Sequence, residues 1–157
     1  MTEKFTFFWS GPFSQWHKAP FEIDHMIFNC AEQWMMWQKA CLFGDRETAK
    51  QILMVKNPRE QKNLGRMVKD FNPDVWAAAC KEIVKRGNLA KYSQNPMLLD
   101  LLSKTKGTTL VEASPYDRIW GIGLAEDDPK AQKRETWKGK NLLGEILTEV
   151  RKELCGE

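Results

Sequence analysis

The sequence predicts one domain, residues 1–157, built mainly of helices with a few short strands. Most of the chain carries apolar residues at helical spacing, in segments that begin at asparagine or aspartate capping residues. Runs typical of strands are few and short. A length of 157 residues suits a single core and is too short for two comfortable ones.

A helix over residues 29–43 is predicted to lie at the centre of this domain. Its apolar side chains are spread around the whole helical wheel, whereas a surface helix keeps one polar face. Two ionisable residues remain on it, Glu32 and Lys39. Because their spacing of seven positions is close to two turns, both point to one side of the helix. That side therefore holds either two satisfied structural charges or a site, since an unused charge in a core is costly.

Structural roles for the two residues are a clear alternative. Asn29 is a good N-cap, which would put Glu32 at the third helical position of a capping box. The long stem of Lys39 could carry its ammonium to the surface while packing against tryptophan or methionine. The spacing alone favours these structural roles.

Four short runs are predicted as strands, at 5–9, 21–24, 26–28 and 108–113. The second and third form a hairpin around a turn at Asp24-His25, which delivers the chain to the central helix. Between the first strand and the hairpin, residues 13–20 are expected to form a loop.

Five further helices are predicted, at 46–55, 58–68, 73–85, 97–103 and 142–154. Asp45, Asn57, Asn72 and Asn141 are placed to cap four of them. Gly87-Asn88 is expected to end or bend the long helix that starts at Pro73. Residues 127–139 are hydrophilic and are predicted to form a surface excursion anchored by Trp137.

The loop after the 108–113 strand carries a bunch of polar and aromatic side chains. Asp117, Arg118 and Trp120 lie just past the strand, a common place for a rigid scaffold to present chemistry. Gly121-x-Gly123 in the same loop lacks a third glycine and a following helix, so it is not a dinucleotide fingerprint.

The charge pattern argues against a grip on long nucleic acid. The chain has 24 basic and 21 acidic residues, mixed along its length, and a formal charge of +3. It therefore lacks the basic stripe with which proteins meet a nucleic acid backbone. A small anionic ligand is compatible with this pattern.

Cysteine and histidine usage gives no sign of a metal centre. The four cysteines, Cys30, Cys41, Cys80 and Cys155, show no C-x-x-C spacing and are interpreted as reduced core residues of a cytosolic protein. His17 and His25 have no partner at metal-ligand spacing.

No apolar run approaches a membrane span of about 18 residues, and the first residues lack a signal-peptide core. We therefore expect a soluble, cytoplasmic protein with no membrane partner.

Six groups of residues, in order and at family spacing, resemble the NADAR family of YbiA-like N-glycosidases over essentially the whole chain. They are Pro20-Phe21-Glu22-Ile23-Asp24; Cys30-Ala31-Glu32-Gln33 with Gln38-Lys39-Ala40; Leu64-Gly65-Arg66; Gly87-Asn88-Leu89-Ala90-Lys91 with Gln94-Asn95-Pro96; residues 114–123; and Asn141-Leu142-Leu143-Gly144. The chain departs from the family pattern at His25 and Phe71, where glycine is usual. Neither departure is expected to touch the candidate catalytic residues.

The resemblance implies an α+β fold, predominantly helical with a small sheet, and a hydrolase acting on N-glycosyl bonds. Characterised relatives cleave phosphoribosylaminopyrimidine intermediates of riboflavin biosynthesis, releasing the pyrimidine and ribose 5-phosphate. Other members remove ADP-ribose from guanine bases, so nucleic acid is expected only as an ADP-ribosylated substrate. No cofactor, metal or obligate protein partner is implied.

The chemistry of glycosidic cleavage gives roles to the residues in the matching groups. Positive charge builds on the sugar carbon, so a carboxylate from Glu32 or Asp117 would stabilise it or take a proton from water. Lys39, if deprotonated by burial, could form a Schiff base with the sugar. With the resemblance in view, these functional roles are preferred to the structural ones.

Five further residues are predicted to bind substrate. Arg66, Lys91 and Asn95 would hold the phosphate or ribose hydroxyls, and Tyr116 or Trp120 would stack on the base. The competing class is a module that binds ADP-ribose or a related nucleotide without turnover, which would need these residues but not the pair Glu32 and Lys39.

Overall fold

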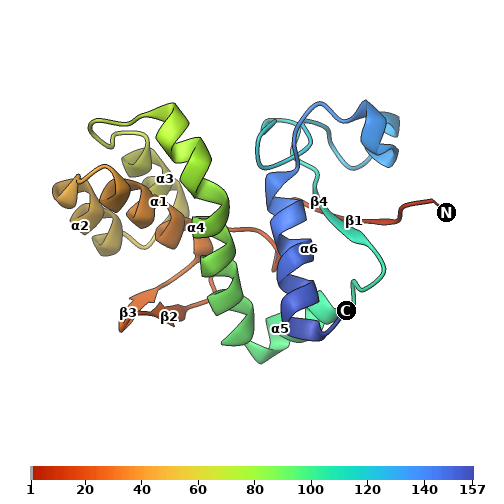
Figure 1. Ribbon diagram of the computed structural model, residues 1–157, viewed down its shortest axis with the longest axis horizontal. Coiled ribbons are helices and arrows are strands. Elements are labelled where there is room, and N and C mark those ends of the chain that lie inside the picture. Colours follow the sequence, from red (N-terminus) through yellow and green to blue (C-terminus); the bar gives the residue numbers. More distant parts are fainter. Residues whose placement is uncertain (1) are drawn as a thin grey trace. The chain divides into compact units, whose positions relative to one another are not determined.

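The computed structural model describes residues 2–157, which divide into two compact units, each treated by itself below (Figure 1). The helical unit comprises Gln15–Asn95, and the terminal unit comprises residues 2–14 together with Pro96–Glu157. The α+β class and the mainly helical content are confirmed. The assignment of residues 1–157 to one domain stays a prediction.

The helical unit is built around α1 (Ala31–Leu42), which packs against three other helices. These are α2 (Arg46–Met54), α3 (Pro58–Gly65) and α4 (Pro73–Ser93). The indole of Trp34 is 2% exposed and meets the Phe28 ring edge-on at 5.1 Å between centroids. The predicted central position of this helix is confirmed, except that its last residues, Cys41 and Leu42, are exposed.

Three of the predicted N-caps form as expected. The side chain of Asp45 accepts a hydrogen bond from the Thr48 amide at 3.1 Å, and that of Asn57 accepts one from the Arg59 amide at 2.8 Å. Asn72 likewise caps α4. These caps bind backbone amides two or three residues along the chain, so local sequence is enough to predict them.

The predicted capping box at the start of α1 is wrong. The N-cap is Cys30, which makes no side-chain cap, and Glu32 is the second helical residue. Asn29 instead donates to the Lys56 carbonyl and accepts from the amide of Gln61. Two long-range hydrogen bonds thus outcompete the local cap, and Glu32 takes no part in a capping box.

The long helix α4 runs through Gly87-Asn88 instead of ending there. A Cβ on Gly87 would lie 2.3 Å from Cδ1 of Trp34, so only glycine lets the helix pass this close to the indole. Trp34 is fixed there by a 2.7 Å hydrogen bond from its Nε1 to the Ile83 carbonyl. Tertiary packing therefore overrides the usual role of glycine as a helix terminator.

Gly87→Ala is expected to lower the free energy of unfolding by about 1–3 kcal/mol, because the new methyl group must displace the indole. Helix propensity alone predicts the opposite sign, a gain of about 1 kcal/mol. Urea unfolding decides between them, with Ala78→Gly at an exposed position of α4 as the measure of propensity alone. A Gly87→Ala protein more stable than the parent would contradict the packing argument.

The hairpin predicted before α1 is confirmed. Strands β2 (Phe21–Ile23) and β3 (Met26–Phe28) pair antiparallel, with Ile23 opposite Met26. The turn residues Asp24 and His25 both have positive φ, 51° and 68°. Such a two-residue turn favours glycine at its second position, so His25 adopts a conformation that glycine would take more easily.

In the terminal unit, β1 (Phe5–Phe8) pairs in parallel with β4 (Thr109–Glu112), and Phe5 lies opposite Thr109. The strands found among residues 2–157 thus form two separate two-stranded sheets. The remaining elements of this unit are α5 (Pro96–Ser103), α6 (Leu142–Cys155) and two short 3-10 helices, Pro129–Gln132 and Arg134–Thr136.

Helix α6 covers the edge of β4 that no strand occupies. Thr148 Oγ1 accepts from the Leu110 amide at 3.0 Å, and Asn141 Oδ1 accepts from the Glu112 amide at 2.9 Å. Asn141 sits at the N-cap position with φ 52° but makes no side-chain cap. Its predicted capping bond is therefore wrong, because its amide is used to pair with the strand.

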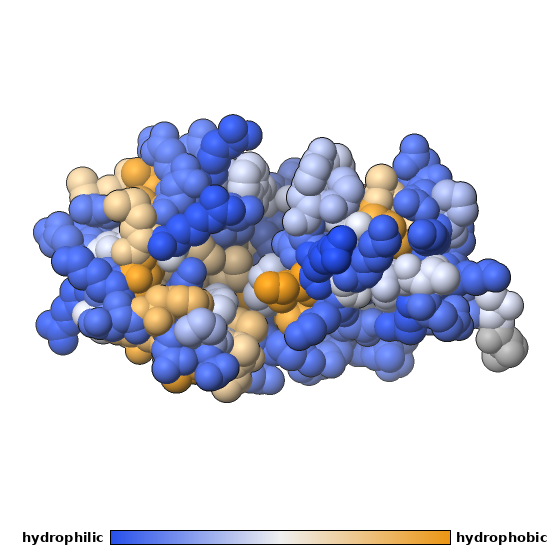
Figure 2. Space-filling view, turned by 90° about the horizontal axis from the view of Figure 1, so that it is seen from above, coloured by the Kyte–Doolittle hydropathy of each residue, from blue (hydrophilic) through white to orange (hydrophobic). Residues whose placement is uncertain are grey.

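The surface excursion after residue 126 is anchored by Trp137, as predicted. Its Nε1 donates to the Ala131 carbonyl at 2.8 Å, and its ring lies 5.2 Å from that of Phe5. Hydrophilic residues predominate on the face shown in Figure 2, where hydrophobic residues form separate small patches. Among residues 2–157, no helix is both long and apolar enough to span a membrane.

Candidate active site

Glu32 lies buried in the first turn of α1, with 5% of its surface exposed. Trp16 Nε1 donates to its Oε1 at 3.1 Å, and the Glu32 amide donates to the Gln15 carbonyl. The loop before the hairpin is thereby held against the helix. The Glu32 carboxylate therefore has a defined position next to the Trp16 indole. A fixed position suits a group that must meet a substrate atom.

The loop is fixed from its other side by α4. Gln15 and Asn88 exchange two side-chain hydrogen bonds, of 2.9 and 3.0 Å. Asn88 is fully buried and also donates to the Val84 carbonyl, one turn back in α4. The position of Asn88 inside a helix therefore serves to hold the loop that carries Trp16.

Lys39 lies on the same side of α1 as Glu32 and is partly buried. Burial lowers its pKa; the Glu32 carboxylate opposes this shift and the Arg66 guanidinium adds to it. Its Nζ lies 4.6 Å from the ring centroid of Phe71 and 5.8 Å from that of Trp76. Glu32 and Lys39 thus interact electrostatically, and the lowered pKa gives Lys39 a larger neutral fraction than a surface lysine has.

Phe71, one of the two departures from the family pattern, lies at this site. The expectation that neither departure touches the candidate catalytic residues is therefore wrong for Phe71. Its ring packs against Phe43, 5.4 Å between centroids, and covers the ammonium of Lys39. Sequence distance hid this contact, since 32 positions separate the two residues.

Helix α3 brings two cations to the same region. Arg66 is its C-cap and, as described above, acts electrostatically on Lys39; Lys62 Nζ lies 6.0 Å from the Trp16 ring. The helices approach closely at Gly65, where a Cβ would lie 2.0 Å from Met36 Sδ. Neither cation forms an ion pair within residues 2–157, so both are available to an anionic group of a ligand.

Lys91 is fully buried on α4, and burial lowers its pKa to about 7, with the Cys30 thiol partly opposing the shift. Its Nζ lies 5.0 Å from the ring of Tyr92. Asn95, one turn further, donates to the carbonyls of Pro20 and Lys91 and so joins α4 to the hairpin. Both residues stay predicted substrate ligands.

Lys91 also predicts a pH dependence of stability. The unfolded lysine, with a pKa near 10.5, binds a proton that the folded one, with a pKa of about 7, releases, so stability rises with pH between these values. Lys91→Met is expected to reduce the slope of unfolding free energy between pH 7 and 9 by up to about 1.4 kcal/mol per pH unit. Chemical unfolding at four pH values measures this slope; an unchanged slope would mean that Lys91 titrates normally. Above pH 9 the raised pKa of Cys30 acts in the opposite direction.

The three remaining candidates lie in the terminal unit. Asp117 accepts from the amides of Ile119 and Trp120 at 2.9 and 2.8 Å, which closes the loop after β4. Tyr116 is 85% exposed, with its ring 5.9 Å from that of Trp9, and Trp120 is partly buried. The carboxylate of Asp117 thus has a structural role, and a catalytic one stays a prediction.

Sequence reasoning missed several neighbours of Glu32 and Lys39. Nothing in the sequence places Lys62 near Trp16, and nothing pairs Trp16 with Glu32 or Trp76 with Lys39. Each of these contacts joins separate elements, so no local spacing signals it. Residues 2–157 also contain no group of three His, Cys, Asp or Glu side chains placed to hold a metal ion.

Comparisons with known proteins agree on one family. The model of the NADAR domain matches residues 7–155. A protein of Acanthamoeba polyphaga mimivirus named as an N-glycosidase is 40% identical, over 97% of both chains. The Caenorhabditis elegans protein irg-1 is 45% identical over 81% of this chain, which corresponds to 61% of its own length.

The fold agrees with a solved member. The NMR structure of the E. coli protein YbiA superposes with a TM-score of 0.80 at 27% identity, covering 99% of this chain and 87% of that one. The Shigella flexneri relative is named N-glycosidase YbiA, with 28% identity over 94% of this chain. The resemblance found in the sequence is confirmed, and the chain belongs to the NADAR domain family, among whose members are proteins named N-glycosidases, hydrolases of N-glycosyl bonds.

Proposed function

We propose that this chain is an N-glycosidase that hydrolyses the C–N bond of phosphoribosylaminopyrimidines, releasing the pyrimidine and ribose 5-phosphate. The observation that carries the proposal is the pair formed by Glu32 and Lys39. A buried carboxylate and an amine with a lowered pKa lie together on one side of α1, with aromatic rings and cations beside them. A carboxylate and a partly neutral amine are the groups that cleavage of a ribosylamine uses.

Lys39 acts as the nucleophile. A ribosylamine opens to an imine at C1 of the sugar, and the neutral amine of Lys39 adds to that carbon. The Glu32 carboxylate takes a proton from the lysine nitrogen of this adduct and gives it to the pyrimidine nitrogen, which leaves as the C–N bond breaks and the lysine imine forms. Water adds to the resulting lysine imine and expels ribose 5-phosphate as the aldehyde, which regenerates Lys39.

Glu32 transfers the protons of both half-reactions. Protonation of the departing nitrogen and removal of a proton from water are successive uses of one carboxyl group. The hydrogen bond from Trp16 Nε1 holds Oε1 of this carboxyl group in place. A direct attack of water on C1, with Glu32 as base and Lys39 as an electrostatic partner, is the alternative that the trapping experiment in the Discussion separates.

The substrate's phosphate would bind Arg66 and Lys62. These residues are one turn apart at the end of α3, which suits a phosphate reached from the sugar that Lys39 holds. Stacking of the flat pyrimidine on Tyr116 or Trp120, which belong to the terminal unit, stays a prediction from the sequence. Lys91 and Asn95 are proposed for the ribose hydroxyls.

Two observations support a small substrate over an ADP-ribosylated nucleic acid. The chloroplastic riboflavin biosynthesis protein PYRR of Zea mays is 32% identical over 71% of this chain, a region that makes up 17% of that protein. The net charge of +3 is also small for a protein that grips nucleic acid. A cytoplasmic setting, expected from the cysteine usage, belongs to the same proposal.

The test compares kcat/KM for a phosphoribosylaminopyrimidine and for ADP-ribosylated guanine in DNA, at the same salt concentration. The proposal predicts the higher value for the small substrate. A higher kcat/KM for ADP-ribosylated DNA would contradict the proposed substrate but not the N-glycosidase chemistry. Binding of both without release of base would identify the chain as a nucleotide-binding module.

A further inference from the structure

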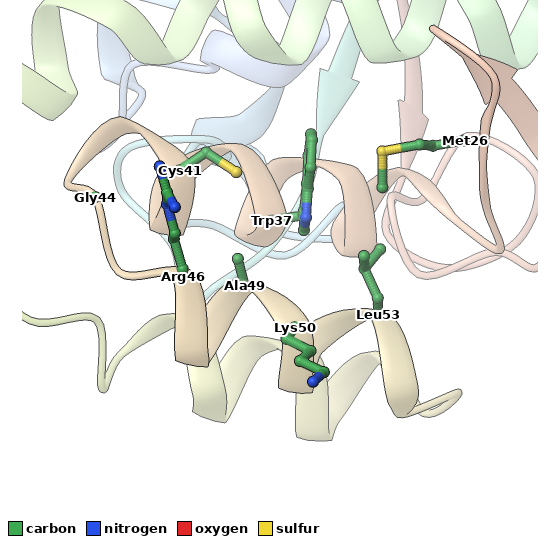
Figure 3. Close-up of a pocket in the computed structure, with 8 residues that line it drawn as sticks. All are labelled: Met26, Trp37, Cys41, Gly44, Arg46, Ala49, Lys50 and Leu53. Carbon is green, nitrogen blue, oxygen red and sulfur yellow. The ribbon is translucent and has the colours of Figure 1, made fainter.

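An open cavity of about 450 Å³ lies at the surface of the helical unit, on the face of α1 away from Glu32 and Lys39. Trp37 and Cys41 follow Glu32 by five and nine positions, which turns them by about 140° and 180° around the helix. The cavity is therefore separate from the site described above. Its lining comes from β3, from α1 and from the start and one side of α2 (Figure 3).

The cavity wall is mostly apolar and carries one open hydrogen-bond donor. Met26, Ala49 and Leu53 form the wall with the indole of Trp37, which packs against Phe28 at 5.4 Å. The indole N–H of Trp37 has no hydrogen-bond partner within residues 2–157, and its nitrogen is directed toward α2 (Figure 3). An unpaired donor beside an apolar surface suits a ligand that combines a flat apolar body with an acceptor.

The charged residues at the rim of the cavity are both basic. Arg46 and Lys50 are one turn apart on α2, and Arg46 extends from that helix toward Cys41 (Figure 3). Neither cation forms an ion pair within residues 2–157, and the lining contains no aspartate or glutamate. The cavity is thus complementary to an anion.

We propose that this cavity is a second binding site, which takes a small aromatic monoanion. The aromatic body would lie against Trp37, Met26 and Leu53, and the acidic group would meet Arg46 and the Trp37 N–H. A volume of about 450 Å³ lies within the range of small-molecule sites. The site is independent of the proposed catalytic residues, so it stands whatever the substrate.

The probe is 1-anilinonaphthalene-8-sulfonate, titrated into the intact protein by fluorescence, with the uncharged N-phenyl-1-naphthylamine as its matched neutral analogue. We expect saturable binding of the sulfonate at one site and at least about tenfold weaker binding of the neutral analogue, because its acidic group is missing. The double variant Arg46→Ala, Lys50→Ala should lose about tenfold in affinity for the sulfonate. Lys56→Ala, an exposed lysine outside the cavity, should bind like the parent.

Cys41 locates the site without any substitution. It lines the cavity and is exposed, so the bound sulfonate should slow its alkylation by iodoacetamide at least threefold, while alkylation of Cys155 in the terminal unit stays unchanged. Peptide mass spectrometry measures both rates. Equal affinity for the neutral analogue, an unaffected double variant, or equal protection of both cysteines would each overturn the proposal.

Discussion

Glu32→Gln is expected to lower kcat for base release by about 10²- to 10⁴-fold, the range in which general acid–base catalysis contributes. Glutamine keeps an oxygen that accepts from Trp16 Nε1 but can neither bind nor release the catalytic proton. The fold should survive, since Glu32 has no capping role in α1. Release of free pyrimidine, followed by chromatography, measures kcat, and urea unfolding checks the fold.

Glu47→Gln is the matched control for this prediction. Glu47 is an exposed glutamate in the first turn of α2, and the substitution should leave kcat unchanged. A folded Glu32→Gln protein with near-normal turnover would show that the buried carboxylate has no part in the chemistry.

Borohydride added during turnover is expected to trap ribose 5-phosphate on Lys39. The hydride reduces the imine between Lys39 and C1 of the sugar to a stable secondary amine, and peptide mass spectrometry identifies the modified residue. Lys39→Arg should abolish both the adduct and base release, because a guanidinium stays protonated and forms no imine. It keeps a positive charge near Glu32, so an electrostatic role alone would leave part of the activity.

Two lysines serve as internal controls in the same experiment. Lys50, exposed on α2, should carry no adduct, whereas Lys91 is buried with a pKa lowered to about 7 and is the alternative nucleophile. An adduct on Lys91 would identify this residue of α4, and not Lys39, as the nucleophile. Turnover without any adduct would favour direct attack of water with Glu32 as base.

Local sequence signals predicted the elements whose stabilising contacts are local. Asp45, Asn57 and Asn72 cap their helices through amides two or three residues away. The turn at Asp24-His25 and the strands beside it also follow from neighbouring residues. The pairing of Glu32 with Lys39 belongs to the same class, because helical geometry alone brings residues seven positions apart to one side.

Predictions failed where distant contacts decided the structure. Gly87 lies inside α4 because the Trp34 indole packs against it. Asn29 does not cap α1 because its side chain is hydrogen-bonded to Lys56 and Gln61. The amide of Asn141 pairs with β4 for a similar reason. Single-sequence reasoning has no access to these partners, since none lies within one helical turn of the residue it controls.

The candidate site shows the same division. The sequence identifies Glu32, Lys39 and Arg66, which the structure brings together, but not the Phe71 ring over the amine or the indole that holds the carboxylate. Phe71 is informative because the chain departs there from its family pattern.

The most direct measurement of the central claim is the stoichiometry of products formed by the purified protein from a phosphoribosylaminopyrimidine. The proposed chemistry breaks one C–N bond and adds one water, so free pyrimidine and ribose 5-phosphate should appear in equal amounts and in many turnovers per protein molecule. Chromatography of the base and an enzymatic assay of the sugar phosphate give both quantities from one reaction. Substrate recovered intact, with no release of base from ADP-ribosylated guanine either, would contradict the assignment of this chain as an N-glycosidase.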